Sequence, residues 1–240
     1  MHFTGETTVG AIVAEDFRTA AVFHEFGIDF CCGGRRTLAE ACRERNMEPE
    51  AVLTALTRSC SVPGIVPRFD EWSPETLIGY IVGTHHAYVK QALPVLIAHT
   101  RKLAEAHGGR HPELRDVAEL TRQIAAEMSS HMIKEEQILF PYIAAAAEAV
   151  ERGKPAPVGP FGSIENPIAM MEAEHDAAGD AVASIRALTG GYVPPADGCA
   201  TYRIALQELE AFERDLHTHV HLETNILFPK ARRLVQFQRA

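Results

Sequence analysis

An eleven-residue motif occurs twice in this chain of 240 residues, from His131 to Pro141 and again from His219 to Pro229. The copies share six residues in the same places: a histidine, a glutamate four positions later, and the run Ile-Leu-Phe-Pro. Another histidine precedes each copy, His86 by 45 residues and His175 by 44. The repeat predicts a domain of two similar halves, each of which supplies two histidines and one glutamate.

Helical spacing of apolar residues predicts the fold around this repeat. The pattern runs over residues 74–106, 112–149, 165–188 and 199–236, and no stretch alternates with a period of two for long enough to require a strand. Short breaks within each half, and a longer break rich in Pro and Gly at residues 153–167, are typical of an up-down four-helix bundle. The chain is therefore predicted to be all-α.

Residues 1–62 predict a separate small helical domain that carries Cys31 and Cys32. Two prolines and a glycine between residues 61 and 68 indicate a linker, so the bundle domain is expected to occupy residues 73–240.

Local signals divide the small domain into helices. Asp16 is placed to cap a helix that continues to Phe26, and Thr37 with Glu40 forms a capping box for the next helix. Pro49 suits the first turn of a further helix.

The repeated ionisable groups have a spacing that favours a metal centre. A histidine and a glutamate four residues apart lie on one face of a helix, about 6 Å apart along its axis. The two histidines of each half stand at similar distances from the turn between their helices, so all the groups can meet at one level. The set comprises His86, His131, Glu135, His175, His219 and Glu223.

The type and number of these ligands indicate a pair of metal ions. Four imidazoles and two carboxylates exceed the needs of one tetrahedral zinc ion, and the two acids can bridge two metals. Nitrogen and oxygen donors in a helical bundle suit two iron ions, while manganese and zinc stay open on ligand type. A duplication that only preserved packing would explain Ile-Leu-Phe-Pro, but it explains identical ionisable groups poorly because burying them unpaired is costly.

Composition narrows the function classes. The net charge of −9 argues against a nucleic-acid partner, since such binding requires a basic face. No stretch approaches the roughly 20 apolar residues of a membrane span, and the first ten residues lack a signal-peptide pattern. Five cysteines without a regular framework indicate free thiols in a reducing cytoplasm. Cys42, Cys60 and Cys199 are expected to pack in the core.

The adjacent Cys31 and Cys32 form the second candidate site. They precede Arg35 and Arg36 and the helix that begins near Thr37, which would favour thiolates over thiols. Neighbouring cysteines are poorly placed to chelate one metal permanently, so transient metal hand-off, thiol redox chemistry or reaction with nitric oxide fits better. Two inert residues at a turn are the alternative.

These motifs together are similar to one family. The four-helix pattern with its six groups resembles the hemerythrin-like domain, and residues 29–34, Asp-Phe-Cys-Cys-Gly-Gly, resemble the short domain that precedes it in the iron-sulfur cluster repair di-iron proteins, also called the repair of iron centres family. The resemblance covers essentially the whole chain. It implies a non-haem centre of two irons with two histidines each, bridged by Glu135 and Glu223 and by an oxo group or water.

The resemblance also orders the neighbouring polar residues. His86 rather than His85 is favoured as the ligand from its distance to Leu93-Pro94, which the family also has, and His85 is expected at the surface or behind the ligands.

Other acids and histidines near the six groups are expected to face solvent or to line a path. His217 and His221 point about 200° away from His219, which predicts that both are solvated, and Glu136 is expected to be a surface charge. Glu127 and Glu174 resemble acids that form a polar path from the irons to the surface in the family, and ordinary helix carboxylates are the alternative.

The function that the resemblance implies is repair of, or iron supply to, iron-sulfur clusters damaged by nitrosative or oxidative stress, with iron-sulfur client proteins as partners. Two alternatives stay open: a nitric oxide reductase that produces nitrous oxide, and a binding protein that senses oxygen or nitric oxide. Whether the chain is an enzyme is therefore undecided. It contains no flavin or nicotinamide motif, so electrons would come from a donor protein, which favours repair. A homodimer is compatible with the sequence.

Overall fold

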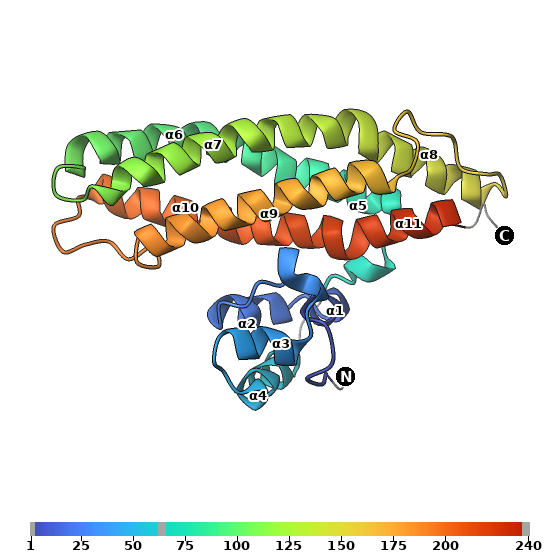
Figure 1. Ribbon diagram of the computed structural model, residues 1–240, viewed down its shortest axis with the longest axis horizontal. Helices are drawn as coiled ribbons and strands as arrows, with labels where there is room; N and C mark the ends of the chain where they lie inside the picture. The colour runs from blue at the N-terminus through green and yellow to red at the C-terminus, as the bar shows by residue number, and fades with distance from the viewer. Residues whose placement is uncertain (1–2, 62–65, 237–240) are drawn as a thin grey trace.

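Four long helical segments run side by side in the computed structural model, which describes residues 3–61 and 66–236 (Figure 1). We number these segments as bundle helices one to four. They consist of α5 (Pro74–Tyr80), η3 (Ile81–His86) and α6 (Ala87–His107); α7 (Glu113–Lys134), η4 (Glu135–Leu139) and α8 (Phe140–Glu151); α9 (Glu165–Leu188); and α10 (Ala200–His221), η5 (Leu222–Leu227) and α11 (Phe228–Gln236). Contacts join α6 to α7, α7 to α9, α9 to α10, and α10 back to α6, which is the expected up-down ring.

The all-α prediction is confirmed. Throughout residues 3–61 and 66–236 the backbone forms no β-strand, only isolated bridges. Ser73 caps the first bundle helix by accepting the backbone N–H of Thr76 at 3.2 Å, and Pro74 follows at its first turn. Positive φ angles at Gly190 and Gly191 end α9, as expected for a left-handed helix exit.

The apolar interior of the molecule is divided into two clusters. One cluster fills the bundle from Leu103 and Leu114 down to Leu216, and it continues into the N-terminal unit. The other contains the repeated Leu-Phe pairs at residues 139–140 and 227–228. The six predicted metal-binding groups lie at the level between the clusters, so apolar layers cover them from both directions.

Three segments of the bundle helices are π-helical rather than α-helical. They are Ile81–His86, Glu135–Leu139 and Leu222–Leu227, and each contains one of the predicted metal-binding groups. A π-turn inserts one residue into a helix and changes the direction of the side chains that follow, and such turns are frequent at functional sites. The helical periodicity of the sequence did not predict them.

The N-terminal unit packs against one side of the bundle near the middle of its length (Figure 1). It contains α1 (Val9–Glu15), α2 (Thr19–Glu25), η1 (Cys32–Arg35), α3 (Leu38–Glu44) and α4 (Pro49–Cys60). The short turn η1 contacts α9 and α10, and α1 contacts η5. A further turn, η2 (Phe69–Glu71), leads into the bundle. Part of the predicted linker, residues 62–65, lies outside the described residues.

The local signals of this unit were predicted with one error. The capping box of Thr37 and Glu40 is present, and Pro49 stands at the first turn of α4. The prediction that Asp16 caps a helix through Phe26 is wrong, because Asp16 instead follows the end of α1. Its carboxylate binds the guanidinium of Arg18 at 2.6 Å and the backbone N–H of the same residue at 3.0 Å, so its backbone bond falls one residue before α2 begins at Thr19. None of the helices in the described parts of the chain is both long and apolar enough to cross a membrane.

Candidate metal centre

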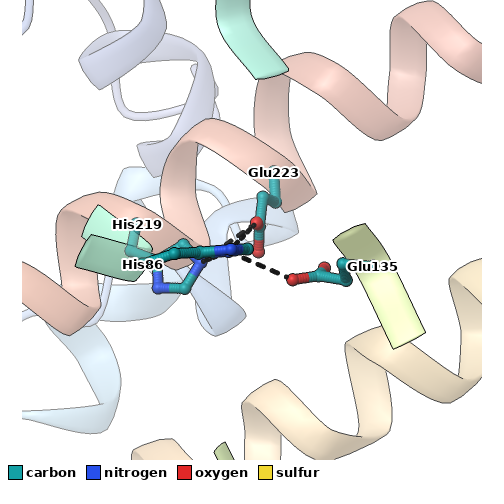
Figure 2. A group of neighbouring side chains, drawn as sticks. All are labelled: His86, Glu135, His219 and Glu223. Carbon is teal, nitrogen blue, oxygen red and sulfur yellow. Dashed lines mark hydrogen bonds and ion pairs between the residues drawn. The ribbon is translucent and has the colours of Figure 1, made fainter. Parts of the chain in front are cut away.

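The structure brings all six predicted groups together in the bundle interior. They form two overlapping sets that share both glutamates: His86 and His219 with Glu135 and Glu223, shown in Figure 2, and His131 and His175 with the same two acids. In each set the donor atoms lie within 4.8 Å of one another. Each set takes one histidine from each half of the duplicated domain, so the halves are interleaved rather than side by side.

The distances suit shared ions. The Nε2 atoms of His86 and His219 are 3.1 Å apart, and those of His131 and His175 are also 3.1 Å apart. Two ligands bound to one ion at about 2.1 Å are separated by about 3.0–3.4 Å at ordinary coordination angles. The carboxylate of Glu135 lies 3.2 Å from His131 Nε2 and 3.4 Å from His86 Nε2, which places it between the two sets.

Unpaired oxygen atoms test whether a metal pair fits this site. Glu135 and Glu223 are fully buried, and Glu135 Oε1, Glu135 Oε2 and Glu223 Oε2 accept no hydrogen bond. Histidine nitrogens lie close to Oε2 of both acids, but not in hydrogen-bond geometry. Buried carboxylates without partners cost several kcal/mol unless a cation compensates them. The donor set therefore fits two cations, each facing two imidazoles and both carboxylates.

The buried acids change the protonation of the histidines around them. Burial by itself would lower the pKa of His86, but Glu135 and Glu223 outweigh it and raise the pKa to about 10. The same balance, led by Glu135, raises the pKa of His131 to about 9. Imidazoles bind metals only when deprotonated, so cations that enter this site must displace protons.

The outer nitrogens of the four histidines have different partners. His86 Nδ1 lies 2.8 Å from Glu136 Oε1, which also accepts from Lys90 at 2.7 Å. His131 Nδ1 lies 2.8 Å from Glu174, which pairs with a lysine on the neighbouring turn. The two histidines of the second half have weaker support: His175 Nδ1 meets the Thr224 hydroxyl at 3.1 Å, and His219 Nδ1 has no partner. Carboxylates behind a ligating imidazole fix its orientation and raise its basicity.

Aromatic residues of the repeat hold two of the rings in place. The Phe140 ring stacks on His86 with centroids 5.7 Å apart, and Phe228 stacks on His175 at 6.1 Å. Each phenylalanine therefore supports the upstream histidine of its own half. The shared Ile-Leu-Phe-Pro run has a packing role and a positioning role at once.

His85 and His86 have different places in the structure. His86 Nε2 points into the centre, whereas His85 Nδ1 binds Asp215 at 2.8 Å and its ring stacks on His219 with centroids 5.8 Å apart. His85 was expected either at the surface or behind the ligands. It is 4% exposed, so it lies behind the ligands.

Two expectations about neighbouring residues are wrong. His221 is completely buried against the Phe30 ring at 5.7 Å, and burial lowers its pKa to about 4. Glu136 is not a free surface charge, because it lies behind His86. Glu174 contacts the centre through His131, whereas Glu127 is exposed on α7. The burial of His221 was hidden in the sequence because it depends on the docked N-terminal unit.

The loop that carries Cys31 and Cys32 is organised by Asp29. The Asp29 carboxylate accepts the backbone N–H groups of Cys31, Cys32 and Gly33 at 2.7–3.1 Å. It also accepts the Cys31 thiol at 3.0 Å, and the two sulfur atoms are 3.9 Å apart. Two thiolates on one tetrahedral metal are separated by about 3.8 Å, so this pair is better placed for chelation than the sequence suggested. Asp29, Cys31 and Cys32 together form a third possible cation site.

The predicted thiolate is wrong for Cys31. The hydrogen bond with Cys32, burial, and the nearby Asp29 charge raise the pKa of the Cys31 thiol well above its usual value. The two arginines do not offset this effect, because Arg35 binds Glu172 and Arg36 pairs with Glu44 and, at 3.7 Å, with Asp29 rather than with the sulfur. Cys31 is therefore held as a neutral thiol until a metal or a partner displaces its proton.

A side chain of the repeat connects this loop to the metal centre. Asn225, two residues after Glu223, donates to the backbone carbonyls of Phe30 at 3.3 Å and Cys31 at 3.0 Å. Gly10 and Gly34 pack so closely on its amide that a Cβ at either position would collide with it.

Two cavities adjoin the cysteine loop. A small cavity of about 120 Å³ lies between the loop and the metal centre, and it is lined by Cys32, Arg35, Glu172, His175, Asp176 and Thr224. A larger cavity of about 620 Å³ lies on the other side of the loop, where Cys31 and Cys32 face α9 and α10. The small cavity thus places the Cys32 sulfur near His175 of the metal centre.

Comparison with known proteins gives matches over both parts of the chain. Residues 5–59 match the family model ScdA_N, described as a Domain of Unknown function (DUF542). Residues 78–231 match the model described as the Hemerythrin HHE cation binding domain. The second match covers the bundle and includes all six groups of the candidate centre.

Curated relatives match along nearly the whole chain. The chain is 34% identical over 227 residues to the iron-sulfur cluster repair protein YtfE of Yersinia pseudotuberculosis serotype O:1b (strain IP 31758), with 94% of this chain and 96% of the relative covered. The protein of the same name from Yersinia pestis (strain Pestoides F) matches with the same identity and coverage.

Proposed function

The chain belongs to the iron-sulfur cluster repair family and joins an ScdA_N domain to a hemerythrin-like domain, and we propose that it binds two iron ions and supplies iron to damaged iron-sulfur clusters. In this proposal residues 73–240 form the iron-holding domain and residues 1–62 form a domain that presents Cys31 and Cys32. The single observation that carries the proposal is the pair of overlapping four-donor sets, in which three of the four buried carboxylate oxygens have no hydrogen-bond partner.

The six groups have distinct parts in holding the metal. His86 and His219 would bind one ion, His131 and His175 the other, and Glu135 and Glu223 would bridge them. Six protein ligands over two ions leave coordination positions for an oxo group or water and for small ligands such as nitric oxide or oxygen. An iron pair bound there supplies ions that can be exchanged with a client. The apolar clusters on both sides keep bulk water away from the bridging carboxylates.

Protons on the chain's own groups control release. His86 and His131 bind protons readily beside the two acids, and each proton bound there removes one ligand. Glu136 and Glu174 oppose this loss, because they hold the rings with Nε2 directed inward. The centre is thus built to retain a metal pair that competing protons or an altered charge can loosen.

The cysteine loop supplies the receiving ligands. Asp29, Cys31 and Cys32 converge within the reach of one cation, and Cys32 shares a cavity with His175. Asn225 holds the loop on the segment that carries Glu223. An iron ion that leaves the His131–His175 set would therefore meet the Cys32 sulfur across this small cavity.

The cellular setting follows from the same chemistry. All five cysteines are free, which is consistent with a reducing cytoplasm. Iron-sulfur proteins are the expected clients, and an electron donor protein would set the oxidation state of the iron pair. A homodimer is not required for either site, since every predicted ligand comes from one chain.

The test is metal analysis of freshly purified protein, combined with Mössbauer spectroscopy and transfer of iron to an apo iron-sulfur protein. We expect two irons per chain, a coupled pair in the spectrum, and cluster rebuilding in the client. Zinc in place of iron, or two uncoupled ions, would contradict the proposed centre. Catalytic nitrous oxide, measured by gas chromatography with a reductant and nitric oxide, would favour the reductase alternative.

A further inference from the structure

The end of the bundle farthest from the chain termini holds a second cluster of reactive groups (Figure 1). There the turn between α6 and α7 lies beside the segment that leads into α10. His107, the last residue of α6, meets Cys199, the residue just before α10, with Nε2 and Sγ 3.3 Å apart. Cys199 was expected to pack in the core, but it is exposed. This cluster is about 20 residues along α10 from His219, so it is separate from the metal centre.

The imidazole of His107 is oriented to donate to the sulfur. Only 9% of the residue is exposed, and its Nδ1 is buried without a hydrogen-bond partner. A buried N–H without an acceptor costs more than a buried lone pair beside apolar atoms, so the favoured tautomer carries its proton on Nε2. The Nε2–H then points at Sγ, and a sulfur that accepts a hydrogen bond is stabilised as a thiolate. The Tyr202 ring packs edge-on against His107, with centroids 5.4 Å apart, and fixes this orientation.

The surrounding charges do not oppose a thiolate. The carboxylate of Asp197, two residues before Cys199, pairs with Arg110 at 3.0 Å and lies 3.1 Å from His111 Nε2. Glu113 pairs with the other nitrogen of His111 at 3.3 Å. The backbone N–H groups at the start of α10, that of Tyr202 first, lower the pKa of the Cys199 thiol. The remaining charged group at this helix start is Arg203, whose sign also favours an anion.

We propose that Cys199, paired with His107, is a reactive thiolate and a modification site for hydrogen peroxide. The sulfur attacks one peroxide oxygen, so an S–O bond forms as the O–O bond breaks. The sulfur is oxidised to a sulfenic acid. The hydroxide that leaves takes a proton from the solvent and becomes water. Thiolate character and exposure together determine which cysteine reacts in this way.

Other cysteines of the chain provide internal controls. Cys60 is half-buried, and burial together with Asp16 raises its pKa to about 11. Cys42 is buried, and its pKa is raised by burial as well. At pH 7 the modification should therefore be selective for Cys199 over both.

The test measures the alkylation rate of each cysteine in the full-length protein with iodoacetamide, resolved by mass spectrometry, from pH 5 to pH 10. We expect Cys199 to react at least about tenfold faster than Cys60 at pH 7, with a midpoint below that of an ordinary thiol. His107→Phe should slow Cys199 about tenfold at pH 7 and leave its rate at pH 10 within about twofold, because the thiol is then ionised without help. If the substitution instead reduced access to Cys199, alkylation would be slower at both pH values.

Peroxide treatment followed by a sulfenic-acid probe then tests the reaction itself. We expect the probe to label residue 199 in the unaltered chain and to give no label there in Cys199→Ser. The metal content of the two proteins should be the same. Should His107→Phe fail to fold, the pH profile of the unaltered protein decides: a Cys199 midpoint at or above that of Cys60 overturns the proposal. Equal rates for Cys199 in the unaltered chain and the His107 variant at pH 7 would overturn it as well.

Discussion

The two copies of the eleven-residue repeat share their metal-facing residues but differ on their outer faces. In the first copy Ile133 is 54% exposed, and Gln137 also faces solvent. The corresponding residues of the second copy, His221 and Asn225, are covered by the N-terminal unit. The positions that are identical between the copies therefore build the centre and its packing. Among the positions that differ, those of His221 and Asn225 form the docking surface for the cysteine loop.

The largest effect should follow from changing a shared residue. Glu135→Gln or Glu223→Gln removes a charge that faces both donor sets, so the iron content is expected to fall from two per chain to one or none. The two variants should behave alike, because each acid contacts histidines of both sets. Metal analysis checks the content, and circular dichroism of the metal-free proteins checks that both remain folded.

Two irons retained in either variant would show that the carboxylate is not a bridge. Glu127→Gln is the matched control, since Glu127 is exposed on the same helix as His131 and should leave the metal content unchanged.

A smaller effect should follow from changing the residues behind the histidines, where the two halves differ. Glu136→Gln and Glu174→Gln each remove a carboxylate from an Nδ1 atom and are expected to weaken metal binding about 10–100-fold. Thr224→Val removes only a hydroxyl from His175 and should cost less than either. Competition with a chelator of known affinity measures all three. Equal losses in the three variants would mean that the two halves hold metal in the same way.

A third difference between the copies concerns the docking of the cysteine loop rather than metal binding. Asn225→Ala removes two hydrogen bonds to the cysteine loop, each with a net contribution of about 0.5–1.5 kcal/mol. Hydrogen exchange of the amides in residues 29–34 should become roughly tenfold faster, and iron transfer to a client should slow, while the iron content stays at that of the unaltered protein. Gln137→Ala is the equivalent change in the first copy and should alter none of these. Faster exchange in the Gln137 variant would contradict the docking assignment.

The sequence predicted those features that depend on local chemistry. Helix boundaries followed from apolar spacing and from caps such as Ser73, and convergence of the donors followed from the register of the repeat. The prediction that Asp16 caps a helix was wrong because its carboxylate has a nearer partner in Arg18. The π-helical segments were not foreseen, since inserting one residue in a helix changes side-chain direction without leaving a pattern in composition.

Features that depend on contacts between distant segments could not be read from the sequence. The burial of His221 arises where the N-terminal unit meets the bundle. The neutral thiol of Cys31 depends instead on the fold of its own buried loop, which brings the Cys32 thiol and the Asp29 carboxylate against it. Cys199 was misplaced because its partner, His107, is 92 residues away. The repeat itself carries a signal of this interface, because it differs at the positions of His221, Thr224 and Asn225, which are the residues that face the N-terminal unit or the cavity beside it.

The smallest expected effect belongs to an exchange of one residue between the copies. Gln137→Asn gives the first copy the side chain of the second at an exposed position, where it lies free of the cysteine loop. Asparagine favours a helix less than glutamine by a few tenths of a kcal/mol, so the free energy of unfolding should change by about 0.5 kcal/mol or less. The reverse exchange, Asn225→Gln, adds a methylene where Gly10 and Gly34 already press on the amide, and overpacking of this kind costs about 1–3 kcal/mol. Denaturant unfolding of the metal-free proteins measures both. Similar losses of unfolding free energy in the two variants would mean that the outer faces of the repeats do not differ in function. The assignment of the second copy to docking would then be wrong. The assignment of the metal centre would not be affected.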